Sequence, residues 1–512
     1  MTTPSRMRVV IAGGGTAGWL AAALLTRQLS ALVNVTLVES EEIGTVGVGE
    51  STIPTVRAFH ALIGLDEAEF MAATGATFKL GISFEHWSRV GDRYIHSFGD
   101  LGRSTWMGDF HHFWLEARAQ GIAAELGDYC LEHRAAELGR FATGGETPLN
   151  YAYHFDAGSY ARYLREACET AGLERVEGRI ARVERDGESG HITRLHLADG
   201  RIVAGDLFLD CTGFRALLIG EAMGVGFEDW SHWLPANRAL PVQTSSVEPA
   251  RPYTRAIAHS AGWQWRIPLQ HRVGNGLVYC SDYLSDDEAQ ARLYAQVEGE
   301  RLVEPNPIRF RTGRRLQAWS GNCVALSLAS GFVEPLESTS IHLVMIALTR
   351  LLQVMPLGGI SPAAVARYNE QARRELEAIR DFITLHYYLN GRPEPFWVRC
   401  RTTPPPDSLT ERIALFAEGA HAYQDTHDLF RVASWVQVML GQRLQPKRHH
   451  PLGRIMPPDR LAGALNDIRS RVGQTVAGLP THQVFLGSYL QRHGTSTSSA
   501  VMPPEQSGRF AP

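Results

Sequence analysis

The sequence lacks paired cysteines. Six cysteines are scattered along 512 residues, and no two of them form a CxxC pair. This spacing excludes a disulfide framework and a thiolate zinc site, so we expect buried thiols that pack as small apolar side chains, and no metal centre. The cysteines are Cys130, Cys168, Cys211, Cys280, Cys323 and Cys400.

Long apolar runs are also missing. No stretch reaches the roughly 18 uninterrupted apolar residues that a membrane helix needs. The apolar run "VVIA" near the N-terminus passes into glycines and is too short for a signal-peptide core. These absences predict a cytoplasmic protein that does not contact membranes.

A strong net charge is absent as well. The chain has 50 Lys and Arg residues against 54 Asp and Glu residues, which gives a formal net charge of −4. A nucleic-acid binder usually carries a basic patch, so this balance favours small-molecule chemistry instead. There is no internal repeat, and the only low-complexity segment is the tail at 491–512, which we expect to be flexible.

A strand, a glycine turn and a helix open the chain. "MRVVIAGGGTAGWLAAALLTRQL" places Gly13, Gly15 and Gly18 in a GxGxxG pattern between an apolar strand and an alanine-rich helix. Such glycines allow a tight turn and let a pyrophosphate approach the backbone at the helix N-terminus. The next strand, "VNVTLVES", brings Glu39 to the position of a ribose ligand. This order predicts a dinucleotide-binding fold; the alternative is a glycine turn without a cofactor.

A later strand favours FAD over NAD. "GDLFLDCTGFRALL" contains Asp210, Thr212 and Gly213, and it is similar to the returning strand of FAD enzymes of the glutathione-reductase type. No second GxGxxG follows for NAD(P)H. We therefore expect FADH2 from a separate NAD(P)H-dependent flavin reductase.

Several further motifs resemble one family, the flavin-dependent halogenases of the tryptophan-halogenase group. "GWQWRIP" at 262–268 resembles their WxWxIP signature, although a lone WxW also fits ordinary packing on one face of a strand. "VGVGESTIPT" at 46–55 resembles their flavin-contacting strap, and "GATFKLGISF" at 75–84 their lysine-bearing segment. "ASGFVEPLESTS" at 329–340 resembles their flavin- and glutamate-bearing segment, and "DFITLHYYLNGRPEPFW" at 381–397 their C-terminal helical part.

The resemblance covers residues 8 to about 450 and implies both a fold and a cofactor site. The implied fold class is α/β, with a FAD-binding, glutathione-reductase-like Rossmann module, mixed sheets and a mainly helical substrate lobe. The signature residues are Trp263, Trp265, Ile267 and Pro268. The residues expected to contact FAD are Gly13, Gly15, Thr16, Ala17, Gly18, Glu39, Gly49, Glu50, Ser51, Thr52, Ile53, Pro54, Asp210, Thr212, Gly213, Gly331 and Phe332.

The lobes are expected to follow the order of the chain. Residues 1–350 form the FAD module, with 91–150 assigned either to it or to the substrate lobe. Residues 351–490 form the helical lobe, because "EQARRELEAIRDFITLHYYL" has apolar residues at helical spacing. The tail at 491–512 belongs to neither lobe, and no sequence signal sets the oligomeric state.

The chemistry that the resemblance implies needs a lysine and a glutamate. Halide is a poor nucleophile toward an aromatic ring, so reduced FAD and O2 first oxidise bromide or chloride to hypohalous acid. Lys79, among apolar neighbours that lower the pKa of its amine, matches the lysine that holds this oxidant, either as a haloamine or by a hydrogen bond. Glu337 matches the catalytic carboxylate, which orients the oxidant or takes the ring proton. Thr339 and Ser340 are expected at the halide; an ordinary capped helix N-terminus would carry the same residue types.

The substrate expected from the resemblance is a small, electron-rich aromatic. His96, Phe98, Pro54 and Trp435 match positions around the indole pocket of the family. Tryptophan-specific members clamp the amino-acid group with a Tyr-Tyr pair and an acid, and "VASWVQVMLGQ" stands in that region here. We therefore expect indole or a substituted indole as substrate and free tryptophan as a poor one.

Two other functions fit the glycine turn. A flavin hydroxylase would share the FAD fold, but its DG pair and GDAAH-like stretch are replaced here by "CTGF" and "ALSLASGF". A non-enzymatic flavin-binding sensor would not need Lys79 or Glu337. Alanine at either residue therefore separates a sensor from an enzyme.

Overall fold

The computed structural model describes residues 6–42 and 49–493 of the chain. A six-stranded sheet contains the strand that precedes the opening glycine turn, and its strands pair in parallel except for the antiparallel edge pair of β20 (Trp319–Ser320) with β21 (Cys323–Ala325). Parallel strands are covered by helices on both faces, which explains why the first strand is an almost unbroken apolar run. In spatial order the strands are β20, β21, β12 (Leu207–Asp210), β1 (Met7–Ala12), β2 (Val33–Glu39) and β8 (Glu174–Glu177).

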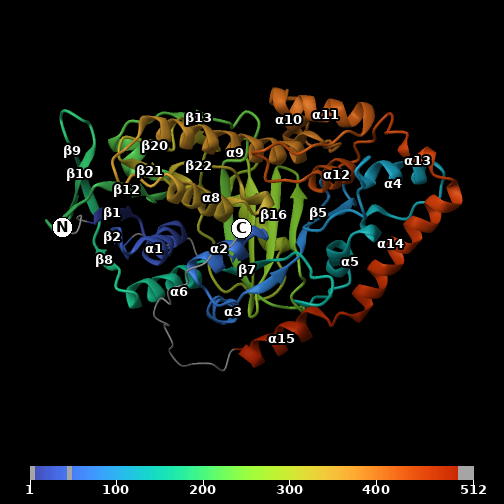
Figure 1. Cartoon of the computed structure of the whole chain (residues 1–512), viewed down its shortest axis with the longest axis horizontal. Coiled ribbons are helices and arrows are strands. Elements are labelled where there is room, and N and C mark those ends of the chain that lie inside the picture. Colours follow the sequence, from blue (N-terminus) through green and yellow to red (C-terminus); the bar gives the residue numbers. More distant parts are fainter. Residues whose placement is uncertain (1–5, 43–48, 494–512) are drawn as a thin grey trace.

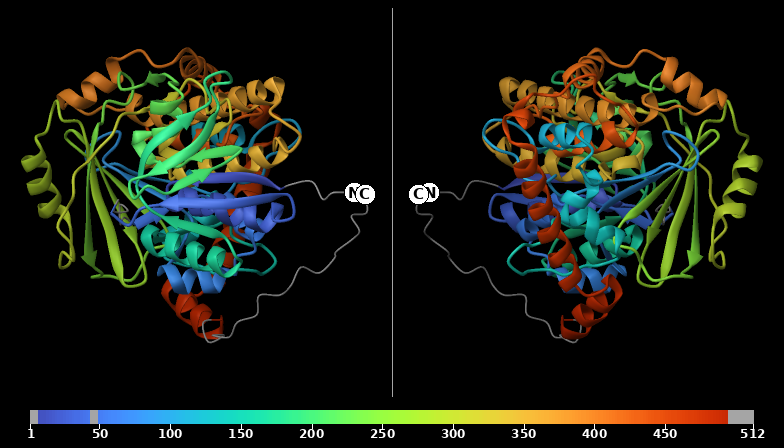
Figure 2. Two further views of the ribbon diagram at one scale, coloured as in Figure 1. Left: turned by 90° about the vertical axis from the view of Figure 1, so that its left-hand side faces the viewer. Right: turned by 90° about the vertical axis from the view of Figure 1, so that its right-hand side faces the viewer.

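A second, seven-stranded sheet stands at one side of the molecule (Figure 2). Its neighbours are antiparallel except for one parallel pair, β15 with β5. In spatial order the strands are β18 (Ile308–Arg309), β14 (Arg238–Ser245), β17 (Arg272–Tyr279), β16 (Gly262–Pro268), β15 (Thr254–His259), β5 (Gly81–Glu85) and β6 (Arg93–Ser97).

A small antiparallel sheet joins the cofactor strap to the lysine segment. Its strands, in order, are β3 (Gly49–Ser51), β7 (Ala152–Asp156) and β4 (Thr77–Lys79). His154 in the middle strand lies opposite Ser51 on one side and opposite Thr77 on the other. Two further three-stranded sheets consist of β9 (Ile180–Arg185), β10 (Ile192–Leu197) and β11 (Ile202–Ala204), and of β13 (Phe227–Asp229), β19 (Gly313–Arg315) and β22 (Gly331–Phe332).

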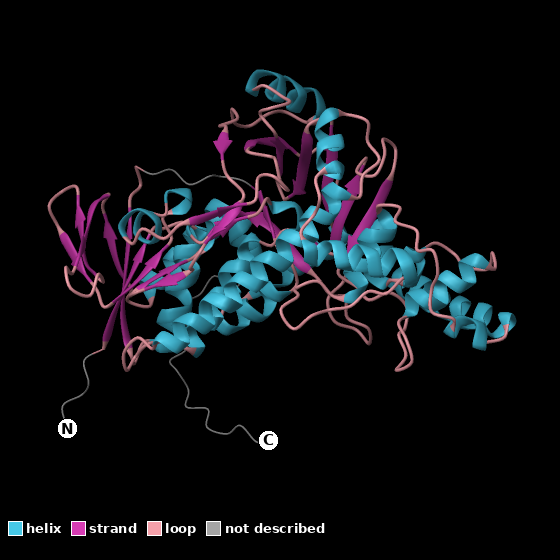
Figure 3. Cartoon of the chain, turned by 90° about the horizontal axis from the view of Figure 1, so that it is seen from above, coloured by secondary structure: helices cyan, strands magenta, loops and turns pink. Residues whose placement is uncertain are grey.

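The helices form a band beside the strands (Figure 3). From Ser340 to His493 every regular element is a helix. The earlier helices are α1 (Thr16–Leu29), α2 (Thr55–Ile63), α3 (Glu67–Thr74), α4 (Phe110–Ala119), α5 (Leu131–Glu137), α6 (Ala157–Thr170) and α7 (Asp286–Gln296). The later ones are α8 (Ser340–Gln353), α9 (Pro362–Tyr388), α10 (Pro395–Thr402), α11 (Asp407–Gly419), α12 (Val432–Gly441), α13 (Leu452–Ile455), α14 (Pro458–Gly478) and α15 (His482–His493). Short helical turns are η1 (Leu126–Tyr129), η2 (Gly213–Arg215), η3 (Leu217–Ala222), η4 (Ser327–Ala329) and η5 (Pro335–Glu337).

The longest helix, α9, connects the two large sheets (Figure 1). At its start the Tyr368 ring packs on Trp319 of the parallel sheet, with ring centres 5.4 Å apart. Near its end the His386 ring lies 4.6 Å from Phe84 of the second sheet. This helix therefore carries side chains from the six-stranded sheet to the seven-stranded sheet.

The architecture confirms the predicted fold class, a mixed α/β structure with helices after the sheets. Within residues 6–42 and 49–493 no helix has the length and apolarity to cross a membrane, and no cluster of three or more metal-ligating side chains exists. All six cysteines are free, and all but Cys211 are buried. The predicted tail falls mostly on residues 494–512, which lie outside the described part.

Candidate active site

Lys79 lies at the end of β4 with its side chain fully buried. Its Nζ donates to the Thr52 carbonyl at 3.0 Å and to Ser338 Oγ at 2.8 Å. The same atom lies 5.2 Å from the centre of the Phe98 ring. Burial lowers the pKa of Lys79 to about 7, although the nearby Glu337 charge acts in the opposite direction. Near neutral pH a large fraction of this side chain is therefore an uncharged amine, which is a nucleophile.

Glu337, at the end of η5, is buried between two histidines. Its Oε2 lies 2.9 Å from His96 Nδ1, and its Oε1 lies 3.0 Å from His386 Nε2. His386 Nδ1 lies 2.9 Å from the Phe382 carbonyl, which can only accept, so Nδ1 carries a hydrogen. The contact between His386 Nε2 and Glu337 is then attractive only if a proton lies between them. Burial alone would raise the pKa of Glu337, but His96 and His386 outweigh it and lower that pKa to about 2.

The second glutamate of the segment, Glu334, contacts the signature strand instead. Its Oε2 accepts from Trp263 Nε1 at 3.1 Å and from the Tyr387 hydroxyl at 2.9 Å. Burial raises the pKa of Glu334 to about 7. The Trp263 and Trp265 rings are 6.3 Å apart, as expected for residues i and i+2 on one strand face. Glu334 thus holds the signature tryptophan, whereas Glu337 faces the lysine side.

The glycine turn has the shape of a pyrophosphate cradle. Gly13 has φ +110°, and a Cβ there would stand 2.3 Å from the Cys211 carbonyl oxygen. A Cβ on Gly18 would stand 1.9 Å from the Gly13 carbonyl oxygen, so helix and strand pack more closely than any side chain allows. Gly15 caps α1 without a side-chain hydrogen bond, and a Cβ there would contact no described atom. Thr16 and Ala17 begin α1, so their amides share its free N-terminus.

Two acids lie beside this turn. Glu39 pairs with Arg175 at 2.5 Å, and its carboxylate approaches Gly14 so closely that a Cβ there would overlap it. Asp210 is buried, and its two oxygens accept from Thr212 and from the amides of Leu218 and Ile219. Asp210 therefore fixes the loop that starts at Thr212 and Gly213. Both of its carboxylate oxygens are occupied by these hydrogen bonds. The glycine turn, with a free helix N-terminus and an acidic side chain beside it, fits a dinucleotide such as FAD.

The strap enters the described structure at β3, since residues 46–48 lie outside it. Gly49 packs against Ile267 of the signature strand, where a Cβ would stand 3.4 Å from the Ile267 side chain. Glu50 is half-buried, and Ser51, Thr52 and Ile53 are buried. Pro54 precedes α2 as its N-cap residue.

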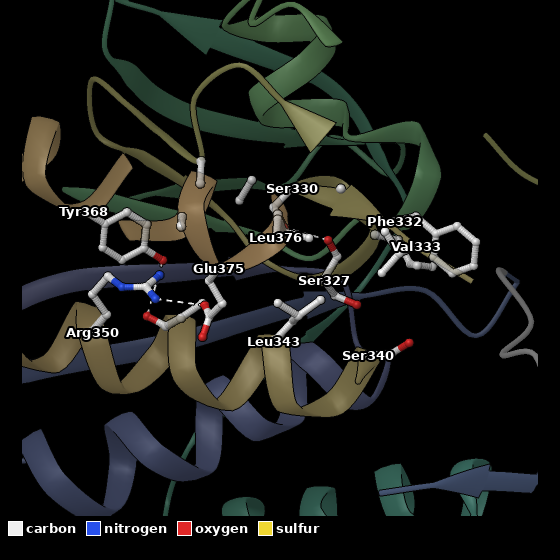
Figure 4. A pocket seen from close by; sticks show the side chains of 16 residues that line it. Ser327, Ser330, Phe332, Val333, Ser340, Leu343, Arg350, Tyr368, Glu375 and Leu376 are labelled. Atoms are coloured by element: carbon white, nitrogen blue, oxygen red, sulfur yellow. Dashed lines mark hydrogen bonds and ion pairs between the residues drawn. The ribbon is translucent and has the colours of Figure 1, made fainter. Parts of the chain in front are cut away.

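A pocket between η4, β22, α8 and α9 brings predicted flavin and halide residues together (Figure 4). Gly331 and Phe332 line it on one side and Ser340 on another. The ion pair of Arg350 with Glu375, at 2.9 Å, lies farther along the same pocket.

Thr339 lies at the N-terminus of α8 beside this pocket. Its side chain is fully buried, and its Oγ1 has no hydrogen-bond partner among the described residues. No side chain of the described residues caps α8, so its N-terminus is left without a side-chain acceptor within that part of the structure. A buried hydroxyl beside a helix N-terminus is a suitable donor set for an anion.

The predicted substrate residues border an aromatic cluster. The His96 ring lies 5.5 Å from Phe382 and 6.0 Å from Phe430. Trp435 packs edge-on against Phe382 at 4.8 Å, and its buried Nε1 has no hydrogen-bond partner in the described part of the chain. Phe98 lies at the Lys79 end, with its ring centre 5.2 Å from the Lys79 Nζ atom.

His96 was predicted from the sequence, but two other histidines of this site were missed. His386 lies in a segment recognised only as helical, and His154 lies in a strand to which no role was assigned. Tyr387, which holds Glu334, was missed as well. A single histidine in an apolar stretch carries no spacing signal, so these partners become visible only in three dimensions.

Comparison with known proteins places the chain in one family. The family model described as tryptophan halogenase matches residues 8–458. Tryptophan 6-halogenase from Streptomyces toxytricini is 35% identical over 96% of this chain and 100% of that protein. The solved structure of a flavin-dependent halogenase from Xanthomonas campestris is 53% identical with a TM-score of 0.93, covering 94% of this chain and 98% of that one. The solved structure of a flavin-dependent halogenase from Brevundimonas sp. BAL3 is 44% identical with a TM-score of 0.90, covering 95% of this chain and 99% of that one.

These matches confirm the family that the sequence motifs had indicated. They extend over both sheets and most of the helices, including the glycine turn, the Lys79 strand and the Glu337 segment. The chain therefore belongs to the tryptophan halogenase family of flavin-dependent halogenases.

Proposed function

We propose that the chain uses FADH2, O2 and bromide or chloride to halogenate an electron-rich aromatic such as indole by electrophilic substitution. The observation that carries this proposal is the buried Lys79 amine beside Glu337, within a boundary of aromatic rings. The FADH2 comes from a separate NAD(P)H-dependent flavin reductase, because the chain has no second glycine-turn motif for a nicotinamide cofactor.

The glycine turn and Glu39 hold the phosphates and ribose of FAD in this proposal. The strap residues from Gly49 to Pro54, together with Gly331 and Phe332, lie along its ring end. When bound, reduced FAD supplies with O2 the two-electron oxidation that turns halide into hypohalous acid. Thr339 Oγ1 and the first amides of α8, including that of Ser340, donate to the halide before it is oxidised.

Lys79 receives the hypohalous acid. Its two hydrogen bonds, to Thr52 and Ser338, fix the Nζ atom in a water-poor setting. With a pKa of about 7 the group provides both an amine that can form a haloamine and an ammonium that can hydrogen-bond the oxidant. Trp263 and Trp265 separate the aromatic substrate from the flavin, so oxygen is not transferred to the ring directly.

Glu337 acts on the aromatic ring. Electrophilic attack produces a cationic ring, which a nearby carboxylate stabilises before it accepts the displaced proton. His386 Nε2 lies 3.0 Å from the same carboxylate and holds it in place. His96, Phe98, Pro54 and Trp435 orient the ring.

The helical lobe is proposed as the substrate side of the molecule. Helices α4 and α5, from the 91–150 segment, pack against α13 and α14. We therefore assign this segment to the substrate lobe with residues 351–490, and the rest of 1–350 to the FAD module.

A reconstituted reaction tests the proposal. The purified protein is supplied with a flavin reductase, FAD, NADH, bromide and indole, and the products are examined by mass spectrometry. We expect monobrominated indole, with tryptophan a poorer substrate. Lys79→Met should abolish the product, because it fills the same buried space without an amine, whereas Lys447→Arg on the surface should retain it. An oxygenated product without bromine would assign the chain to hydroxylation instead.

A further inference from the structure

We propose that His154 is a positioning residue for Lys79 and acts through a one-directional chain of three buried hydroxyl groups. The proposal rests on the proposed function only in taking Lys79 as the group that handles the oxidant. His154 lies in β7, the middle strand of the small sheet, between Ser51 of β3 and Thr77 of β4, and its side chain is fully buried.

Hydrogen bonds connect the Lys79 amine to the His154 imidazole without a gap. Lys79 Nζ contacts Ser338 Oγ at 2.8 Å, and Ser338 Oγ contacts Ser51 Oγ at 3.0 Å. Ser51 Oγ lies 3.1 Å from Thr254 Oγ1, which lies 2.9 Å from His154 Nε2. All five side chains are buried, so water does not compete for these hydrogen bonds.

The far end of the chain fixes its direction. His154 Nδ1 lies 3.0 Å from Thr77 Oγ1, and that hydroxyl donates to the Pro268 carbonyl at 2.7 Å. A carbonyl only accepts, so the Thr77 hydrogen points to Pro268, and His154 Nδ1 must donate to Thr77. The neutral imidazole then accepts at Nε2 from Thr254.

The same rule orders the remaining hydrogens. The single hydroxyl hydrogen of Thr254 is donated to His154, so Thr254 accepts the hydrogen bond from Ser51. Ser51 in turn accepts from the hydroxyl of Ser338. Ser338 therefore presents a lone pair to Lys79 and cannot donate to it. The Lys79 amine is obliged to donate here, and its own lone pair is directed away from Ser338 and is free to meet an electrophilic halogen.

Protonation of His154 would reverse this order. A second hydrogen on Nε2 would make Thr254 an acceptor from the ring, and each hydroxyl would turn until Ser338 donated to the Lys79 lone pair. Burial keeps the pKa of His154 well below its usual range, with Lys79 and His482 acting in the same direction. The charged or titratable groups that face Lys79 and this chain are Glu337, with its partners His96 and His386, and His482 behind the β4 strand.

The polypeptide has only two lysines, Lys79 and Lys447, so the protonation of Lys79 can be measured directly. Protein carrying lysine labelled with ¹³C at the ε-carbon gives two NMR signals, and Lys447→Arg assigns them. The pH midpoint of the Lys79 signal is measured in FAD-loaded wild type, in Thr254→Val and in Thr254→Ser. Valine keeps the shape of threonine and removes the hydroxyl, whereas serine keeps the hydroxyl.

The intact row of hydroxyl hydrogen bonds stabilises the ammonium form of Lys79, because Ser338 can only accept a hydrogen bond from it. Thr254→Val removes one of these hydroxyl groups and should therefore move the titration midpoint of Lys79 down by about one pH unit. The halogenation rate at the pH plateau should fall about tenfold, the effect of losing one orienting hydrogen bond. Thr254→Ser should keep both values, and His154→Leu should reproduce Thr254→Val without an additive loss in the double variant.

An unchanged Lys79 midpoint in both Thr254→Val and His154→Leu, in folded FAD-binding protein, would overturn the proposal. An equal loss in Thr254→Ser would do so as well, because that variant retains the hydroxyl. The NMR measurement does not depend on turnover. If the variants show the shift but the wild-type protein forms no halogenated product, the proposed function is refuted and the role of His154 toward Lys79 still stands.

Discussion

Ser338 combines strain with a contact to the lysine. Its φ is +59°, a left-handed conformation that a residue with a Cβ rarely adopts, and its Oγ accepts from Lys79. Non-glycine residues in such conformations persist where the surrounding structure or a function requires them. The strain here lies at the point where the hydroxyl chain reaches the amine.

Replacement of Ser338 separates these two properties. Ser338→Gly should be more stable than Ser338→Ala by about 1 kcal/mol in the free energy of unfolding, because glycine relieves the left-handed strain. Both variants lack the hydroxyl and should lose most halogenation of indole. Denaturant unfolding and product yield provide the two measurements. Equal stability of the two variants would show that the backbone there is not strained.

Only part of the site was predictable residue by residue. Lys79 and Glu337 stand in ordered motifs, so their types and spacing were informative from sequence. His386 and His154 reach the site from α9 and β7, and each is a lone histidine among apolar neighbours. Such a residue is equally compatible with a core position, and only its contacts with Glu337 or Thr254 distinguish the two.

At the scale of elements, the glycine turn at the start of α1 is the part that local sequence predicts best. Strand, turn and helix follow one another without a gap, so hydrophobic pattern and glycine spacing are sufficient. The seven-stranded sheet was not predictable in the same way. Its β5 and β15 pair in parallel although about 170 residues of chain separate Ser83 from Arg255, and no local pattern encodes that register.

Two alanine substitutions at the glycines of the turn should have different effects, one on stability and the other on FAD binding. Gly18→Ala should destabilise the fold, because its Cβ would stand 1.9 Å from a backbone oxygen that cannot move away. Gly15→Ala should unfold at the same temperature as wild type, since its φ is −73° and its Cβ meets no described atom. It should nevertheless bind FAD at least about tenfold more weakly, because the methyl group occupies the phosphate approach. Thermal unfolding and FAD fluorescence titration measure both; wild-type affinity in Gly15→Ala would contradict this place for the phosphate.

At the scale of the whole molecule, buried neutral histidines make stability depend on pH. Burial lowers the pKa of His60 to about 3 and that of His482 to about 4, and it also keeps the pKa of His154 well below its usual range. In the unfolded chain each histidine binds a proton near pH 6.5. Between pH 6.5 and 4 the unfolded state therefore holds more protons, and stability falls as the pH falls.

The expected loss at pH 5 is about 2 kcal/mol for each of these three histidines. Thermal unfolding at pH 7.5 and at pH 5 should show a clear decrease in Tm on acidification. His60→Phe serves as the comparison: it should be less stable at pH 7.5, because the Tyr160 hydroxyl loses its partner, but its Tm should decrease less on acidification. A steeper decrease in that variant would mean that His60 is not held neutral.

The near absence of lysine bears on how long the enzyme survives its own chemistry. In the proposed reaction, hypohalous acid that escapes the site would attack thiols, thioethers and amines, yet Lys447 is the only exposed lysine and five of the six cysteines are buried. The remaining basic residues are arginines, whose guanidinium groups stay protonated and are poor nucleophiles. The surface thus offers a leaked oxidant few amines and thiols, so the exposed side chains of Trp106 and Met107 are the groups that it would modify.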